Sequence, residues 1–274
     1  MSSSPHPEGQ ILSSDAYPTP TPPAAQARGR NRFSAPATYI LVGINCAVFL
    51  WMVFHGVSPK EPTVQQLVTY GATNPDMIVG GQWWRLLTAT FVHVGLIHIA
   101  TNMWCLWNLG LLGEPLLGPF GLTAVYFLTG VSGNLLALAK NVIFPSHEAS
   151  GAGIFGPVGA GASGAVFGIA GILIVLLSNH KLPIPWSELK RLRRSVVQFA
   201  GLNLVIGLAA NFTSLVNIDN YAHVGGFLCG LALGVPLIPR MTSGRVRYLR
   251  RQKITFSAFT FLLVLFAYWI AKLK

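Results

Sequence analysis

Charged side chains are scarce in this 274-residue chain. Aspartate, glutamate, lysine and arginine together make up only 10% of it, whereas 52% of the residues are hydrophobic. A water-soluble domain of this size has about 25% charged residues to cover its surface. The composition therefore excludes an ordinary soluble protein and indicates one that lies in a membrane.

Acidic residues are scarcer than basic ones, with 8 against 19, which gives a formal net charge of +11. Such a charge is also found in nucleic-acid-binding proteins. Here, however, the lysines and arginines form short clusters between long apolar runs, which is the pattern of a polytopic membrane protein. We therefore expect a lipid bilayer as the environment and no nucleic-acid partner.

Cysteine is limited to three residues, Cys46, Cys105 and Cys229, each inside an apolar run and far from the others. They are typical of small buried hydrophobic residues and not of a disulfide framework or a metal site. The sequence also lacks the His-Glu-x-x-His pattern, which argues against a membrane metalloprotease. We expect no metal and no cofactor.

Long apolar runs are abundant. Each is close to the ~20 residues that cross a hydrocarbon core as a helix, although the fourth is short. Residues 1–36, rich in Ser, Pro, Ala and Thr, predict a disordered tail. The pattern thus predicts an all-α polytopic membrane protein with seven transmembrane helices, at about 38–55, 96–113, 118–140, 162–178, 196–213, 221–239 and 254–271.

The basic residues predict the orientation of these helices. Fourteen of the nineteen lysines and arginines would lie on one side of the membrane, in the tail and in the segments after the fourth and sixth runs. Basic residues are enriched on the cytoplasmic side. We therefore expect a cytoplasmic N-terminus and a C-terminus on the outer side.

Polar residues inside the membrane are costly and mark candidate functional positions. His98 and Asn102 lie four residues apart in the second run, hence on one face of its helix. Taken alone, they also fit interhelical hydrogen bonding.

Residues 150–164, SGAGIFGPVGAGASG, hold six glycines and a proline and should not form a stable helix. The fourth helix should therefore begin late, near Ser163, where free backbone N–H groups could bind an anion. The alternative is that Gly161, Gly164 and their neighbours are only small residues at a helix contact.

The sixth run contains His223, followed by Gly226, Gly230 and Gly234 at four-residue intervals. Such a ridge lets another backbone approach closely, and the glycine face of the fourth helix is the natural partner. If the two helices pack, His223 could accept the hydroxyl proton of Ser163. A single membrane histidine could equally be a haem ligand or a packing residue.

The predicted topology brings these residues to one depth. The second, fourth and sixth helices all run from the outer to the inner side. His98, Asn102, Ser163 and His223 lie near the beginnings of these helices. Their convergence on one layer favours a catalytic site over unrelated packing roles.

Together these residues resemble the rhomboid family of intramembrane serine proteases. The resemblance covers about residues 38–240 and implies a core of six helices at 37–240, with a basic loop and a seventh helix at 241–274. Its motifs are Trp84-Arg85, His98-xxx-Asn102, Glu114, Gly161-Ala-Ser163-Gly164 and Ala222-His223-x-Gly-Gly226.

The resemblance implies a role for each residue. Ser163 would be the nucleophile and His223 the general base of a dyad, with no role for Asp219. Asn102, His98 and the Ser163 backbone N–H would stabilise the oxyanion. Phe167 occupies a position where many relatives have a tyrosine that stacks on the catalytic histidine. The supporting residues would be Trp84, Arg85, Glu114, Gly161, Gly164, Phe167, Gly226 and Gly230.

The implied substrates are single-span membrane proteins with small or helix-breaking residues near the outer face, cleaved at a site that opens to that face. The absence of a clear targeting segment favours a bacterial inner membrane; the sequence does not indicate an oligomeric state. Two alternatives remain: an inactive rhomboid-like protein that binds membrane clients, and a haem or transport protein using His93, His98 and His223.

Overall fold

The computed structural model describes residues 35–144, 158–180, 182, 184–213, 219–238 and 244–273, without the side chains of 206–213. Within these ranges the named elements are all helices, and the one β contact is an isolated bridge between Thr73 and Gly159. The predicted all-α fold is confirmed. Most of the predicted tail (residues 1–34) and most of the glycine-rich stretch (150–157) lie outside the described residues.

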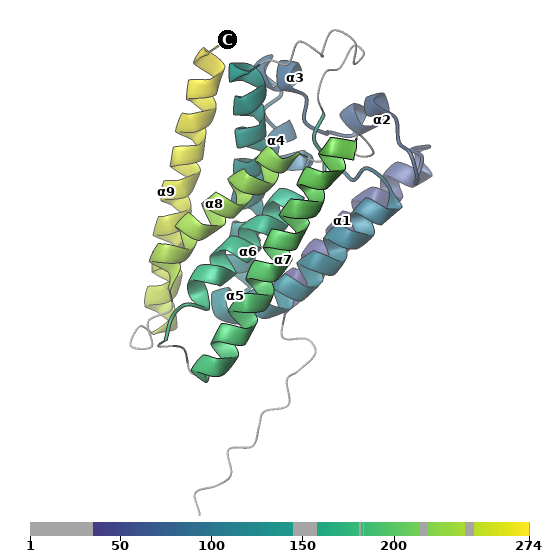
Figure 1. Ribbon diagram of the computed structural model, residues 1–274. Coiled ribbons are helices and arrows are strands. Elements are labelled where there is room, and N and C mark those ends of the chain that lie inside the picture. The colour runs from purple at the N-terminus through teal and green to yellow at the C-terminus, as the bar shows by residue number, and fades with distance from the viewer. Residues whose placement is uncertain are drawn as a thin grey trace, which may run out of the picture. The chain divides into compact units, whose positions relative to one another are not determined.

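Long helices follow the apolar runs, and three short ones occupy the loop between the first two runs (Figure 1). The helices are α1 (Pro36–Phe54), α2 (Val64–Thr69), α3 (Pro75–Val79), α4 (Arg85–Thr88), α5 (Leu96–Ile143), α6 (Ser163–Leu176), α7 (Trp186–Thr213), α8 (Asn220–Leu237) and α9 (Arg245–Lys272).

The second and third predicted spans are joined in α5. Its helical backbone is interrupted at Gly118, where φ is +75°, a conformation that favours glycine, between Pro115 and Pro119. By length and composition, α1, α5 and α9 are long and apolar enough to cross a membrane, while α6 has only 14 residues. The number of seven crossings therefore stays a prediction.

Helix α6 lies in the core of the bundle, in contact with α5, α7 and α8. Its residues from Gly164 to Leu173 are all buried. A helix that is apolar on every side belongs in a protein core or in a membrane, and the burial of α6 by its neighbours places it in the core. The start of α6, and with it Ser163, is consequently held among the other helices.

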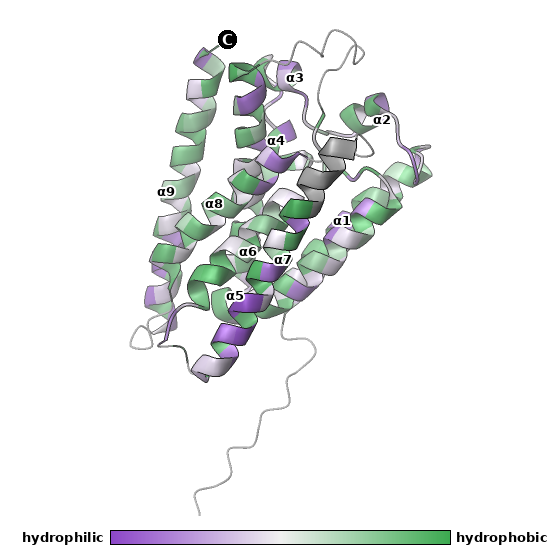
Figure 2. Ribbon diagram, in the orientation of Figure 1, coloured by the Kyte–Doolittle hydropathy of each residue, from purple (hydrophilic) through white to green (hydrophobic). Residues whose placement is uncertain are grey.

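Hydrophilic residues mark one end of the bundle. Figure 2 shows the polar first turns of α7 and α9 at the same end. These turns carry the basic residues Lys190, Arg191, Arg193 and Arg194, and Arg245, Arg247, Arg250 and Arg251. The clustering agrees with the predicted topology, while the assignment of this end to the cytoplasm stays a prediction.

Candidate active site

The backbones of α6 and α8 are in direct contact through glycines. A Cβ atom added at Gly226 would lie 2.0 Å from the carbonyl oxygen of Gly164, and one at Gly230 would lie 2.0 Å from that of Gly168. No side chain fits at such distances. The prediction that the glycine ridge after His223 packs on the glycine face of the fourth helix is therefore confirmed.

Ser163 is the first residue of α6, as predicted from the glycines before it. One turn later the ring of Phe167 stacks on the ring of His223, with 4.4 Å between the centroids and 14° between the planes. Residues four apart share one face of a helix. The imidazole of His223 thus lies against the face of α6 that also carries the Ser163 hydroxyl.

His223 lies in the first turn of α8 and is 7% exposed. Its Nδ1 atom is buried and has no hydrogen-bond partner among the described residues. The nearby carboxylate of Asp219 is engaged at the start of α8, where it accepts hydrogen bonds from the N–H groups of Tyr221 and Ala222, each at 3.1 Å. Asp219 is therefore a helix cap.

The segment before Ser163 is tied to the long loop between α1 and α5. Thr73 N–H donates to the Gly159 carbonyl at 2.8 Å, and Gly159 N–H donates to Thr73 Oγ1 at 2.9 Å. Two residues on, Gly161 has φ of +128° and donates its N–H to the Ala89 carbonyl at 2.9 Å. These bonds hold the chain in the turn that leads into α6.

His93 is a further residue of this region. Its Nε2 accepts a hydrogen bond from Ala162 N–H at 3.4 Å, and its Nδ1 lies 3.1 Å from the Phe91 carbonyl, to which it donates in the matching tautomer. Burial, and secondarily the neighbouring His98, lower the pKa of His93 to about 3, so its ring is neutral at pH 7.

The sequence indicated His93 only within the alternative of a haem or transport protein. Its partner is 69 residues away, and no local spacing could indicate that pairing.

His98 packs directly on the turn before Ser163, because a Cβ at Gly161 would lie 2.6 Å from His98 Cε1. Val94 N–H donates to His98 Nδ1 at 3.3 Å, which leaves the proton of the neutral ring on Nε2. Asn102 lies one turn further along α5, and its Nδ2 donates to the His98 carbonyl at 2.9 Å. One N–H of that amide remains for another acceptor.

Glu114 joins α5 to the start of α1. Its carboxylate accepts hydrogen bonds from Ala37 N–H at 2.9 Å, Thr38 N–H at 2.8 Å and Thr38 Oγ1 at 2.7 Å. An acidic group stabilises the free N–H groups and the positive end of the dipole at a helix N-terminus. Glu114 thus holds the start of α1 against α5.

Arg85 holds the loop between α1 and α5. Its Nη1 donates to the carbonyls of Val68 at 2.6 Å and Ala72 at 3.0 Å, and its Nε donates to Gln82 Oε1 at 2.7 Å. The guanidinium also lies 4.6 Å from the ring centroid of Trp84. Burial lowers the pKa of Arg85. The three hydrogen bonds replace those that the guanidinium would otherwise donate to water.

These features define a class: a helical integral membrane protein in which a serine and a histidine lie in the first turns of two tightly packed helices. Comparison with known proteins specifies it further. The rhomboid domain matches residues 80–240, which is more than half of the chain. The chain belongs to the rhomboid family.

Among its relatives, Rhomboid protease GluP of Bacillus subtilis is 32% identical over 204 residues, covering 73% of this chain and 35% of GluP. Rhomboid-like protease 2 of Toxoplasma gondii is 32% identical over 199 residues, covering 72% and 63%. Rhomboid protease AarA of Providencia stuartii is 27% identical over 252 residues, covering 88% and 87%. The chain thus spans about a third of GluP and most of AarA.

Proposed function

We propose that this protein is an intramembrane serine endopeptidase in which Ser163 is the nucleophile and His223 the general base. The observation that supports this proposal most is the stacking of Phe167 on His223, one turn from Ser163 on the same helix. The names of its relatives, among them Rhomboid protease AarA, point to the same activity.

In the proposed reaction the Ser163 oxygen attacks the scissile carbonyl carbon while its proton passes to His223. The proton then moves to the leaving amine, the peptide bond breaks, and an acyl-enzyme remains until water hydrolyses it. Because His223 Nδ1 is buried and has no partner among the residues that the structure describes, Nε2 would take the proton. Asp219 is occupied at the helix cap, which favours a dyad over a triad.

We assign stabilisation of the oxyanion to the Ser163 N–H at the start of α6, the remaining N–H of Asn102, and His98 Nε2. A donor of this kind is worth about 3–4 kcal/mol in soluble hydrolases. The closeness of His98 to Gly161 supports its part in this set. The loop contacts of Thr73, Ala89 and His93 would keep the donors in place before substrate arrives.

The proposed substrates are single-span membrane proteins. A helical substrate hides its carbonyls in backbone hydrogen bonds, so small or helix-breaking residues near the cleavage site would ease local unwinding. We place the protein in a bacterial inner membrane, with its N-terminus in the cytoplasm and the site open to the outer face. The clustered basic ends of α7 and α9 support this orientation.

The test is cleavage of a single-span reporter by the purified full chain in detergent. Wild type should cleave it, Ser163→Ala and His223→Ala should not, and Ser257→Ala, which removes an exposed hydroxyl on α9, should match wild type. A fluorophosphonate probe should label wild type and fail to label Ser163→Ala or His223→Ala. Folded but inert wild type, or an active Ser163→Ala variant, would refute the proposal.

A further inference from the structure

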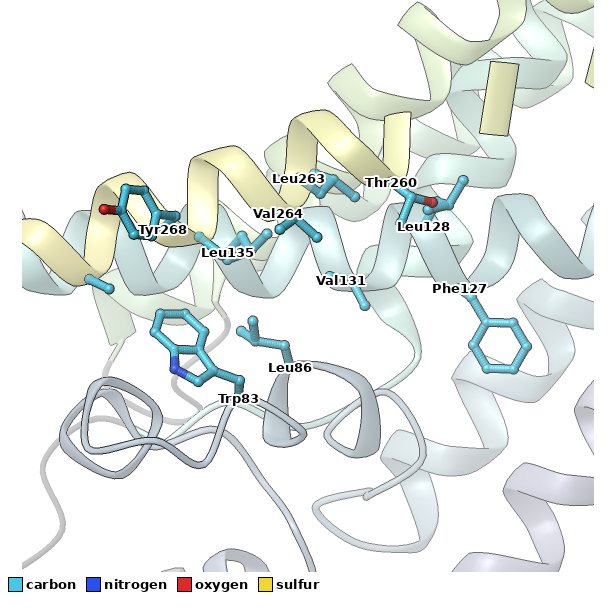
Figure 3. A pocket seen from close by; sticks show the side chains of 12 residues that line it. Trp83, Leu86, Phe127, Leu128, Val131, Leu135, Thr260, Leu263, Val264 and Tyr268 are labelled. Atoms are coloured by element: carbon cyan, nitrogen blue, oxygen red, sulfur yellow. The ribbon is translucent and has the colours of Figure 1, made fainter. Parts of the chain in front are cut away.

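A groove of about 500 Å³ lies between α9, the second half of α5 and the loop segment that holds Trp83 and Leu86 (Figure 3). Val131 forms part of its floor, and Thr260, Ala267 and Tyr268 come from α9. None of its lining residues belongs to α6, the helix of Ser163. The groove is therefore separate from the candidate active site.

The walls of the groove are held by contacts of their own. Asn134 Nδ2 donates to the Leu86 carbonyl at 2.8 Å, which ties the loop segment to α5. Near the C-terminal end of α9, Ile270 is fully buried in a cluster with Leu138 and Ala139. The groove is thus preformed.

The interior of the groove offers almost only hydrocarbon to an occupant. Its one hydroxyl away from the aromatic end, that of Thr260, donates to the Phe256 carbonyl at 2.9 Å within α9. A polar occupant would lose its own hydrogen bonds at this depth without replacement. The occupant's buried part must therefore be apolar.

The opposite end of the groove is amphipathic. Figure 3 shows Trp83 and Tyr268 at this end, away from Thr260 and Phe127. One turn beyond Tyr268, the exposed Lys272 has its Nζ 5.6 Å from the Tyr268 ring centroid. Within the described part of the chain, Lys272 forms no salt bridge. Such aromatic and basic residues are typical of the headgroup level of a bilayer, and Lys272 leaves a positive charge for an anionic group.

We propose that this groove is a binding site for one acyl chain of an anionic glycerophospholipid, with the lipid phosphate at Lys272. The lining residues Thr260 to Ala271 cover eleven helical steps, or about 16 Å at 1.5 Å per residue. That length matches half of a hydrocarbon core of about 30 Å, the depth of a single leaflet.

An acyl chain fits the groove better than a substrate helix. A helix about 10 Å wide and 16 Å long would fill about 1,200 Å³, more than all the empty space of about 1010 Å³ in the groove. A single acyl chain is much thinner.

The experiment uses phosphatidylglycerol with a photoactivatable group in its acyl chain, incorporated with the full-length protein into phosphatidylcholine vesicles. We expect cross-links to concentrate on residues that line the groove, such as Trp83, Leu86 and Leu263. Cross-links spread equally over exposed α9 residues outside the groove, such as Leu262 and Leu265, would overturn the proposal. This map needs only the wild-type protein.

Ala267→Trp tests the apolar groove, and Lys272→Glu tests the phosphate contact. Ala267→Trp should fill the groove and reduce cross-linking at 83–86 at least about tenfold, equivalent to about 1.4 kcal/mol. Ala258→Trp, the same change at an exposed α9 position outside the groove, should leave it unchanged. Equal labelling of the two variants would refute binding in the groove.

Lys272→Glu should weaken labelling by phosphatidylglycerol about fivefold, as expected for about 1 kcal/mol per basic residue at an anionic lipid. It should leave labelling by a diacylglycerol probe, which lacks the phosphate, unchanged. An equal loss with both probes, or no loss with either, would refute the phosphate contact at Lys272.

Discussion

Substitution of Gly226 by alanine tests whether the contact between α6 and α8 sets the geometry of the site. The added Cβ would lie 2.0 Å from the Gly164 carbonyl oxygen, whereas ordinary contacts begin at 3.4 Å. The two backbones would therefore have to separate by about 1.4 Å, the difference between these distances. Because the obstacle is backbone, no change of rotamer can relieve it.

The separation acts next to both proposed catalytic residues, since Gly164 follows Ser163 and Gly226 lies one turn after His223. A displacement of about 1 Å at reacting groups can cost ~100-fold in rate. Overpacking of a core also costs about 1–3 kcal/mol in stability. We expect Gly226→Ala to remain folded with a lowered melting temperature and to cleave a single-span reporter ~100-fold more slowly.

Two controls isolate the cause. A Cβ at Gly43 on α1 would have nothing within 4 Å, so Gly43→Ala should keep full activity. A Cβ at Gly234 would lie 2.6 Å from Val175 Cβ, so the two helices would have to shift there as well, but that position is three turns from His223. Gly234→Ala should therefore lose stability but retain activity. If Gly226→Ala cleaves the reporter as fast as Gly43→Ala, the argument from helix contact is wrong.

Three further predictions concern single side chains. Glu114→Gln should lower the free energy of unfolding by about 1.5–3 kcal/mol, the range for hydrogen bonds to charged groups, and thermal unfolding would show whether the cap of α1 matters. Phe167→Tyr should keep the stack on His223 and its activity, whereas Phe167→Ala should reduce kcat by about 2–10-fold for the loss of 0.5–1.5 kcal/mol; equal kcat values would contradict this. Burial lowers the pKa of His93 from 6.5 to about 3, so the unfolded chain takes up a proton that the folded chain does not, and stability should fall as the pH decreases from 7 to 5. The fall in melting temperature should be smaller in His93→Gln, and an equal fall would show that His93 does not contribute.

The sequence by itself determined the class of the fold and the start of the key helix. Apolar runs of membrane length require helices in any arrangement, because each backbone group must find its partner within its own segment. Glycines before Ser163 exclude a helix there for an equally local reason. The spacing of Gly226 and Gly230 also indicated a close helix contact, since a four-residue interval places small residues on one face.

Only the tertiary structure decided which distant residues meet. The pairing of His93 with Ala162, the capping of α1 by Glu114 and the hold of Arg85 on Val68 join residues 69, 76–77 and 17 positions apart. The groove beside α9 likewise needs three separate segments. A hydrogen bond of this kind depends on how the helices pack, and no local pattern records that packing. The sequence therefore indicated which side chains are candidates, and the packing of α5, α6 and α8 brought them together.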